Sequence, residues 1–88
     1  MPIFEKSNHK YKKYSVISPK GKIIHFGDTR YEQYKDSTGL GIYSHLDHLD
    51  QERRKRYLAR AKKIKDKNGK LTWNNPESSN YYSIRFLW

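Results

Sequence analysis

The segment from Arg53 to Lys65, RRKRYLARAKKIK, constrains the fold of this chain more than any other segment. Eight of its thirteen residues are Lys or Arg, and none is acidic. The apolar residues follow the spacing i, i+1, i+4, i+7, which places them in one stripe along an α-helix. These residues are Tyr57, Leu58, Ala61 and Ile64. The segment is therefore predicted to be a helix that buries one apolar edge and presents a strongly positive face to solvent.

Capping signals predict that this helix runs from about Asp50 to about Lys65. Asp47 or Asp50 can accept hydrogen bonds from the first N–H groups of the helix, which have no partner within it. Glu52 near the start and the lysines near the end also suit the helix dipole. Residues 66–69 (DKNG) follow, and Asn or Gly there can adopt the left-handed conformation that ends many helices.

A β-hairpin is predicted before the helix. Two stretches rich in β-formers, residues 13–17 (KYSVI) and 22–26 (KIIHF), flank the sequence Ser-Pro-Lys-Gly at residues 18–21. Proline presets φ at the second turn position, and glycine accepts the positive φ that often follows. The residues expected to face the core from this hairpin are Tyr14, Val16, Ile24 and Phe26.

The final segment, SSNYYSIRFLW at residues 78–88, fits two secondary structures. Its apolar residues satisfy helical spacing but also alternate as in a strand, and so short a run does not discriminate between them. A well-placed serine N-cap, Ser78 or Ser79, favours a short helix. In either conformation the large apolar side chains need burial, against the hairpin or against another molecule.

Composition limits the chain to one small domain. It has 88 residues, of which 34% are hydrophobic, but 15% are aromatic and can supply large buried areas from few side chains. We predict an α+β fold in which an N-terminal β-hairpin packs on a long basic helix and a short C-terminal helix. Residues 1–12 are expected to form a basic flexible arm, and residues 13–88 a single α+β domain.

Charge is the strongest indication of the partner. The formal net charge is +10, and self-repulsion of this size favours a polyanionic or acidic partner. The chain has no cysteine, which excludes disulfides and Cys-based zinc sites. No apolar run approaches the ~20 residues that span a bilayer, and the N-terminal residues lack the apolar core of a secretory signal. An intracellular location with no membrane partner is expected.

Little in the sequence supports catalysis or metal binding. Four residues before the basic helix have ligand-like side chains, but the spacings typical of zinc sites use Cys or a HExxH helix. These residues are His45, Asp47, His48 and Asp50. Helix capping and charge pairing are simpler roles for Asp47 and Asp50 than metal binding. His45 and His48 are therefore predicted not to bind metal. No convergent acid–base pair is recognisable, and we expect a non-enzymatic protein without a cofactor.

Nucleic-acid binding has the most physical support. Lys and Arg neutralise phosphates and release counterions, which gives affinity without sequence choice. No DNA- or RNA-reading motif is present, so base-specific recognition is not expected. The alternative is that the positive face is only the solvated side of an ordinary domain. The predicted phosphate contacts are Arg53, Arg54, Arg56, Arg60, Lys62 and Lys63.

The order of the segments resembles that of small, uncharacterised basic proteins of nucleocytoplasmic large DNA viruses. The resemblance covers residues 13–88 and rests on KYSVISPKGKIIHFG, HLDHLDQERRKRYLARAKKI and GKLTWNNPESSNYYSIRFLW. Its most specific parts are Arg-Arg-x-x-Tyr-x-x-Arg from Arg53 and the terminal Tyr-Tyr-Ser-Ile-Arg-Phe-Leu-Trp. It implies a viral protein of the infected host cell or the virion, and it implies no particular activity. The alternative function is a minor structural component of a capsid or core, which would bind acidic viral structural proteins.

Overall fold

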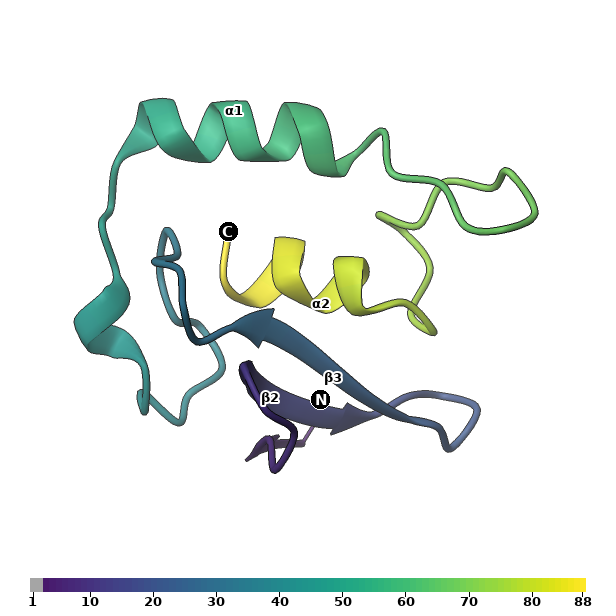
Figure 1. Cartoon of the computed structure of the whole chain (residues 1–88), viewed down its shortest axis with the longest axis horizontal. Helices are drawn as coiled ribbons and strands as arrows, with labels where there is room; N and C mark the ends of the chain where they lie inside the picture. Colours follow the sequence, from purple (N-terminus) through teal and green to yellow (C-terminus); the bar gives the residue numbers. More distant parts are fainter. Residues whose placement is uncertain (1–2) are drawn as a thin grey trace.

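Three strands precede two helices in the computed structural model, which describes residues 3–88 (Figure 1). The strands are β1 (Phe4–Lys6), β2 (Lys12–Ile17) and β3 (Ile23–Asp28). A 3-10 helix, η1 (Ser44–Leu46), lies in the connection to α1 (Gln51–Ala61), and α2 (Ser79–Phe86) follows. Segregation of strands and helices along the chain is the α+β arrangement that the sequence predicts.

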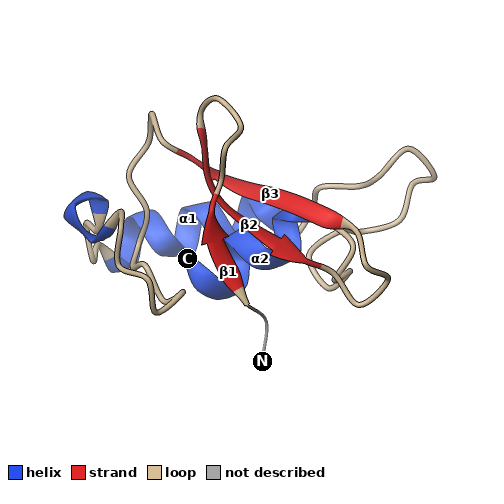
Figure 2. Ribbon diagram, turned by 90° about the horizontal axis from the view of Figure 1, so that it is seen from below, coloured by secondary structure: helices blue, strands red, loops and turns tan. Residues whose placement is uncertain are grey.

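The elements form three layers: the sheet, then α2, then α1 (Figure 1). Helix α2 packs against β3, and α1 packs on the opposite side of α2. Both helices therefore lie on the same face of the sheet (Figure 2). The packing of the hairpin on the C-terminal helix is direct, whereas the basic helix is joined to the sheet through α2. Within residues 3–88, neither helix combines the length and apolar character needed to cross a bilayer.

The predicted hairpin is confirmed as β2 and β3, which pair in antiparallel register with Tyr14 opposite Phe26 and Val16 opposite Ile24. The turn closes as expected, because Gly21 N donates to Ser18 O at 2.9 Å and Gly21 has a φ of 81°. Both residue pairs face α2 and are buried. The core is aromatic-rich, as predicted, and consists of Tyr14, Val16, Ile24, Phe26, Tyr82 and Leu87.

Strand β1 corrects the prediction of a flexible arm over residues 1–12. Residues 4–6 pair antiparallel with β2, with Phe4 opposite Val16. The Phe4 ring packs edge-on against Phe26 and Phe86, with centroid distances of 5.7 and 4.6 Å. One apolar side chain among polar neighbours is thus enough to anchor an edge strand, because the sheet and α2 supply its packing partners. The first two residues of the predicted arm lie outside the described residues.

Helix α1 is shorter than predicted. Asp50 is its N-cap, and the carboxylate accepts hydrogen bonds from the backbone N of Glu52 and Arg53 at 3.0 and 3.2 Å. The helix ends at Ala61, and the expectation that it continues to about Lys65 is wrong. Ile64 leaves the predicted apolar stripe and is 50% exposed. Its carbonyl accepts instead from the backbone N and the hydroxyl of Thr72, at 3.0 and 3.1 Å, which draws the chain out of the helix.

The C-terminal segment is a helix, which is the conformation that the sequence favours over a strand. Ser78 Oγ accepts from Asn80 N at 3.2 Å and caps the first turn. Asn80 Nδ2 donates to Ala61 O at 2.8 Å and to Thr72 Oγ1 at 3.0 Å. This one amide therefore ties the end of α1 to the start of α2.

A buried polar network anchors the irregular linker, residues 29–50, to the sheet. Lys13 Nζ donates to Tyr31 O at 2.9 Å and to Gln33 Oε1. Gln33 Nε2 donates in turn to Tyr43 O at 2.8 Å and to Asp47 Oδ1 at 2.6 Å. Asp47 therefore organises the linker, and capping of α1 falls to Asp50.

Candidate functional site

Helix α1 divides into a packed edge and an exposed basic face. Tyr57, Leu58 and Ala61 turn toward the rest of the molecule, as predicted, together with half-buried Arg54. The remaining predicted phosphate contacts are all exposed: Arg53, Arg56, Arg60, Lys62 and Lys63. Five of the six residues are therefore accessible to a ligand on the outer side of the molecule.

Arg54 differs from the others because it is half-buried and contacts two other segments of the fold. Its Nε donates to the backbone oxygen of Trp88 at 2.7 Å. Its guanidinium lies 4.9 Å from the ring centroid of Tyr34, a cation–π contact. Arg54 thus connects α1 to the linker and to the end of the chain, while its charge remains at the edge of a groove.

Arg53 is the one exposed member with an acidic partner. Its Nη1 lies 2.9 Å from Glu32 Oε1, and both side chains are solvent-accessible. The only other ion pair within residues 3–88 joins Arg30 to Asp28 at 2.8 Å. Arg56, Arg60, Lys62 and Lys63 therefore have no acidic partner in the part of the chain described here.

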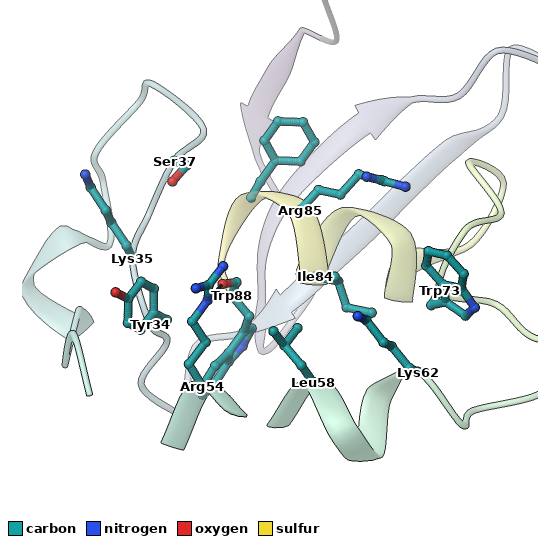
Figure 3. Close-up of a pocket in the computed structure, with 11 residues that line it drawn as sticks. Tyr34, Lys35, Ser37, Arg54, Leu58, Lys62, Trp73, Ile84, Arg85 and Trp88 are labelled. Atoms are coloured by element: carbon teal, nitrogen blue, oxygen red, sulfur yellow. Dashed lines mark hydrogen bonds between the residues drawn. The ribbon is translucent and has the colours of Figure 1, made fainter. Parts of the chain in front are cut away.

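A groove of about 500 Å³ runs between α1 and α2 and reaches the linker (Figure 3). We call it the α1–α2 groove. Apolar side chains contribute to its lining, namely Leu58, Ile84 and Phe86. Four cations surround them, namely Lys35, Arg54, Lys62 and Arg85. No acidic residue lines this groove among the residues described.

Three further groove residues are aromatic: Tyr34, Trp73 and Trp88. Trp88 is stacked on Tyr57, with centroids 4.0 Å apart and ring planes at 7°. Trp73 is half-buried, and Lys62 Nζ lies 5.8 Å from its ring centroid. Across residues 3–88, no aromatic ring packs on Trp73. Its indole thus contacts a cation but no other ring among the described residues.

Sequence reasoning identified two of the four groove cations, Arg54 and Lys62, and missed Lys35, Arg85 and the aromatic Trp73. Lys35 lies in the linker, and backbone hydrogen bonds hold it there: Lys35 N donates to Leu87 O at 3.0 Å. Arg85 comes from α2, and Trp73 from the loop between the helices. Because these residues come from three segments, no local spacing relates them to α1. Their sequence neighbourhoods give no common signal, since Asp36 directly follows Lys35 and Glu77 lies four residues after Trp73.

A second cleft, of about 600 Å³, lies on the other side of α1, against β2 and β3. Lys12, Arg53 and Arg60 line it, but so do Asp28 and Glu32. The carboxylates offset part of the positive charge there. The two clefts thus differ in electrostatic character, and the α1–α2 groove is the one without acids.

The residues with ligand-like side chains do not converge. Asp47 accepts from Gln33, and Asp50 caps α1. His48 Nδ1 accepts from Asp50 N at 2.9 Å, and its Nε2 is buried without a hydrogen-bond partner. Burial lowers the pKa of His48 and so disfavours its charged form. Residues 3–88 contain no group of three or more His, Asp or Glu side chains that could hold a metal ion.

His25 has structural partners. It is hydrogen-bonded through Nδ1 to Ser7 Oγ at 2.7 Å, and its ring stacks on His9 with centroids 3.5 Å apart. Burial, together with the nearby His9 and Lys12, lowers the pKa of His25. No carboxylate is hydrogen-bonded to this imidazole within the described chain, so the group lacks the orienting acid of a typical catalytic histidine.

Residues 3–38 match a family of unknown function (DUF5754). The match covers the sheet and the first part of the linker, and it includes Tyr34 and Lys35 of the α1–α2 groove. No curated protein and no solved structure matches the chain. The family description assigns no activity.

Proposed function

We propose that this protein binds nucleic acid without sequence preference, through phosphate contacts and without catalysis. The observation that carries this proposal is the run of exposed cations on and just after α1. Arg56, Arg60, Lys62 and Lys63 have no acidic partner within residues 3–88, and the net charge is +10. Such a surface gains affinity for a polyanion by releasing the counterions condensed on it.

The arrangement of these cations supports backbone recognition. Exposed Arg side chains present a planar fork of donors that matches phosphate oxygens. Helix α1 has 11 residues and is therefore ~16 Å long, which is about half of one ~34 Å turn of duplex DNA. No base-reading motif is recognisable in the sequence, which supports binding that does not depend on base sequence. The resemblance to small basic proteins of large DNA viruses supports a viral setting.

A second candidate is a structural role in a virion, and one feature favours it. The sheet face opposite the helices carries three exposed isoleucines, of which Ile17 and Ile23 are directly paired across β2 and β3. Ile3 is 80% exposed, Ile17 67% and Ile23 62%. Exposed apolar residues that lie together are typical of protein-binding surfaces. We rank this candidate second because the isoleucines explain a protein contact on the sheet but not the exposed cations of α1, which would need an additional acidic protein surface.

A salt series on duplex DNA tests the proposed function. Binding measured by fluorescence anisotropy should weaken with salt, with a slope of log K against log salt of about −0.9 per neutralised phosphate. Arg56→Ala and Lys63→Ala should each reduce the magnitude of that slope by roughly one contact and weaken all duplex sequences equally.

The matched control is Lys22→Ala, which removes one positive charge from the connection between β2 and β3. This connection lies away from α1 (Figure 1). The salt slope of Lys22→Ala should stay closer to that of the unmodified chain than the slopes of Arg56→Ala and Lys63→Ala do. If the protein binds neither duplex nor single-stranded nucleic acid at low salt, yet binds a viral structural protein, the second candidate replaces the first.

A further inference from the structure

We propose that the α1–α2 groove binds an unpaired segment of nucleic acid, with one base packed on Trp73 and the adjoining phosphates on the surrounding cations. This inference rests on the proposed function and deepens it. Phosphate binding by the outer face of α1 is indifferent to strandedness, because duplex and single strand both expose their backbones. The groove adds a preference for single strands.

The lining of the groove fits a nucleotide better than a bare anion. Leu58 and Ile84 give it an apolar floor with Arg54 and Lys62 beside it, while Lys35 and Arg85 lie at the rim with their charged ends directed away from that floor (Figure 3). A volume of about 500 Å³ lies within the range of small-ligand sites. An apolar surface beside cations suits a ligand that is flat and apolar at one end and anionic at the other, which describes a base and its phosphate.

Among the described residues, Trp73 is the groove aromatic without an aromatic partner, and only the flexible side chain of Lys62 lies over its ring, 5.8 Å from the centroid. One face of Trp88 is taken by Tyr57 at 4.0 Å, and the guanidinium of Arg54 lies over Tyr34 at 4.9 Å. Trp73 has no aromatic neighbour within residues 3–88. Stacking on an aromatic side chain is the usual way in which proteins hold unpaired bases without reading their identity.

One groove cation, Lys62, lies at Trp73, and the other three lie farther from that ring (Figure 3). Lys62 Nζ lies over the Trp73 ring, 5.8 Å from its centroid, so a base that stacks on this face displaces the ammonium toward the adjoining phosphate. Arg85 extends from α2 on the other wall and is exposed, with its guanidinium 4.3 Å from the Tyr81 ring centroid. Arg54 and Lys35 lie farther along the groove, on the side of the linker (Figure 3).

Charge complementarity selects this groove over the cleft beside the sheet. Asp28 and Glu32 line that cleft and would repel a phosphate. The α1–α2 groove has no acidic residue among those described. A duplex keeps its bases stacked inside, so it cannot use the apolar floor or Trp73. A single strand can use both.

The test compares ligands of matched charge on the full chain. We would measure the affinities of four labelled molecules of about twelve nucleotides, a length within the range of single-strand sites. They are oligothymidylate, oligouridylate, an abasic phosphodiester of equal length, and a duplex. The base-containing single strands should bind roughly tenfold more tightly than the abasic strand, as expected for one stacked base. The two base-containing arms distinguish DNA from RNA as the preferred source of the unpaired base.

Trp73→Ala should remove this advantage and bring the base-containing strands to the affinity of the abasic one. Trp73→Phe should retain most of it, because a phenyl ring also stacks. The matched control is Tyr31→Ala, which removes an aromatic ring that is 65% exposed and lies outside the groove. It should leave the ratio of oligothymidylate to abasic affinity unchanged.

Intrinsic tryptophan fluorescence provides a second measurement that needs no variant. Oligothymidylate should quench it at saturation, and the abasic strand should not, because only a base can stack on the indole. This result stays informative even if Trp73→Ala fails to fold.

Different results would overturn the two proposals. Absence of binding to every nucleic acid at low salt would refute the proposed function itself. Binding with equal affinity for oligonucleotide and abasic strand, with equal quenching, would leave phosphate binding intact and refute the groove inference alone. Tighter, Trp73-dependent binding of an acidic peptide of equal charge would assign the groove to a protein partner.

Discussion

The rings of Tyr57 and Trp88 stack in parallel, with centroids 4.0 Å apart and an interplanar angle of 7°. Tyr57 is in the middle of α1, and Trp88 follows α2, so the stack joins the outer helix to the end of the chain. Arg54, one turn earlier on α1, donates to the backbone oxygen of the same Trp88 at 2.7 Å. These two contacts hold together the elements that form the α1–α2 groove.

Trp88→Ala should therefore lower thermal stability substantially. Truncation of a fully packed aromatic residue costs ~3–5 kcal/mol, and a half-buried one costs about 2 kcal/mol. In a domain of this size, that loss corresponds to a decrease in Tm of about 10 °C, measurable by circular dichroism. Tyr31→Ala is the control, and its effect should stay within ~0.5 kcal/mol because the ring is mostly exposed. Equal Tm values for the two variants would contradict the packing role of Trp88.

Gly27→Ala should be among the most destabilising single changes in the sheet. Gly27 has a φ of 77°, and a Cβ there would lie 2.8 Å from Leu87 Cδ1 and 3.0 Å from Lys13 Cβ. The variant combines left-handed backbone strain of ~1–2 kcal/mol with overpacking of ~1–3 kcal/mol. Gly69→Ala isolates the first effect, since its φ is 79° but no atom lies within 4 Å of the added Cβ. Urea unfolding should give a clearly larger loss for Gly27→Ala.

Lys13 should make stability rise with pH. Burial lowers the pKa of Lys13 from 10.5 to about 8, an effect that outweighs the attraction of nearby carboxylates such as Asp28. Between these two values the unfolded chain binds more protons than the folded chain, so stability increases as pH rises. The gain is of the order of 3 kcal/mol at most. Urea midpoints measured from pH 8 upward should increase for the unmodified chain, and Lys13→Met should lack this increase.

Tyr14 should limit that gain at higher pH. Burial, reinforced by the hydrogen bond from its phenol to Asp36, raises the pKa of Tyr14 from 10.0 to about 12. Above pH 10 the folded chain therefore holds a proton that the unfolded chain has lost, and stability falls. A stability maximum near pH 10 is expected. Tyr14→Phe should shift the decline to higher pH, and an unchanged profile would contradict this account.

Zn²⁺ should not bind tightly or in a defined stoichiometry. His48 Nδ1 is engaged with Asp50 N, its Nε2 is buried, and Asp47 is engaged with Gln33. A metal would have to break these contacts before it could recruit ligands. Calorimetric titration of the full chain tests this expectation. A site of micromolar affinity or better that disappears in His48→Ala would show that the histidine cluster rearranges to bind metal.

Local sequence was enough to predict elements whose stability is local. The hairpin of β2 and β3 follows from its Pro-Lys-Gly turn and from the alternation of core-facing apolar residues with outward-facing residues along both strands. Helix α2 follows from the Ser78 N-cap. The start of α1 follows from Asp50. Caps and turns act within a few residues, so their physics is present in the sequence itself.

Tertiary structure decided the features that depend on distant partners. β1 forms because Phe4 meets Phe26 and Phe86, and α1 stops early because Thr72 binds the carbonyl of Ile64. The α1–α2 groove exists because four segments meet there: the linker, α1, the loop with Trp73, and α2. The sequence by itself determined the excess of positive charge and the aromatic content. Only the folded chain determined which cations lie beside which rings, because contacts between segments far apart in sequence depend on packing that no local pattern encodes.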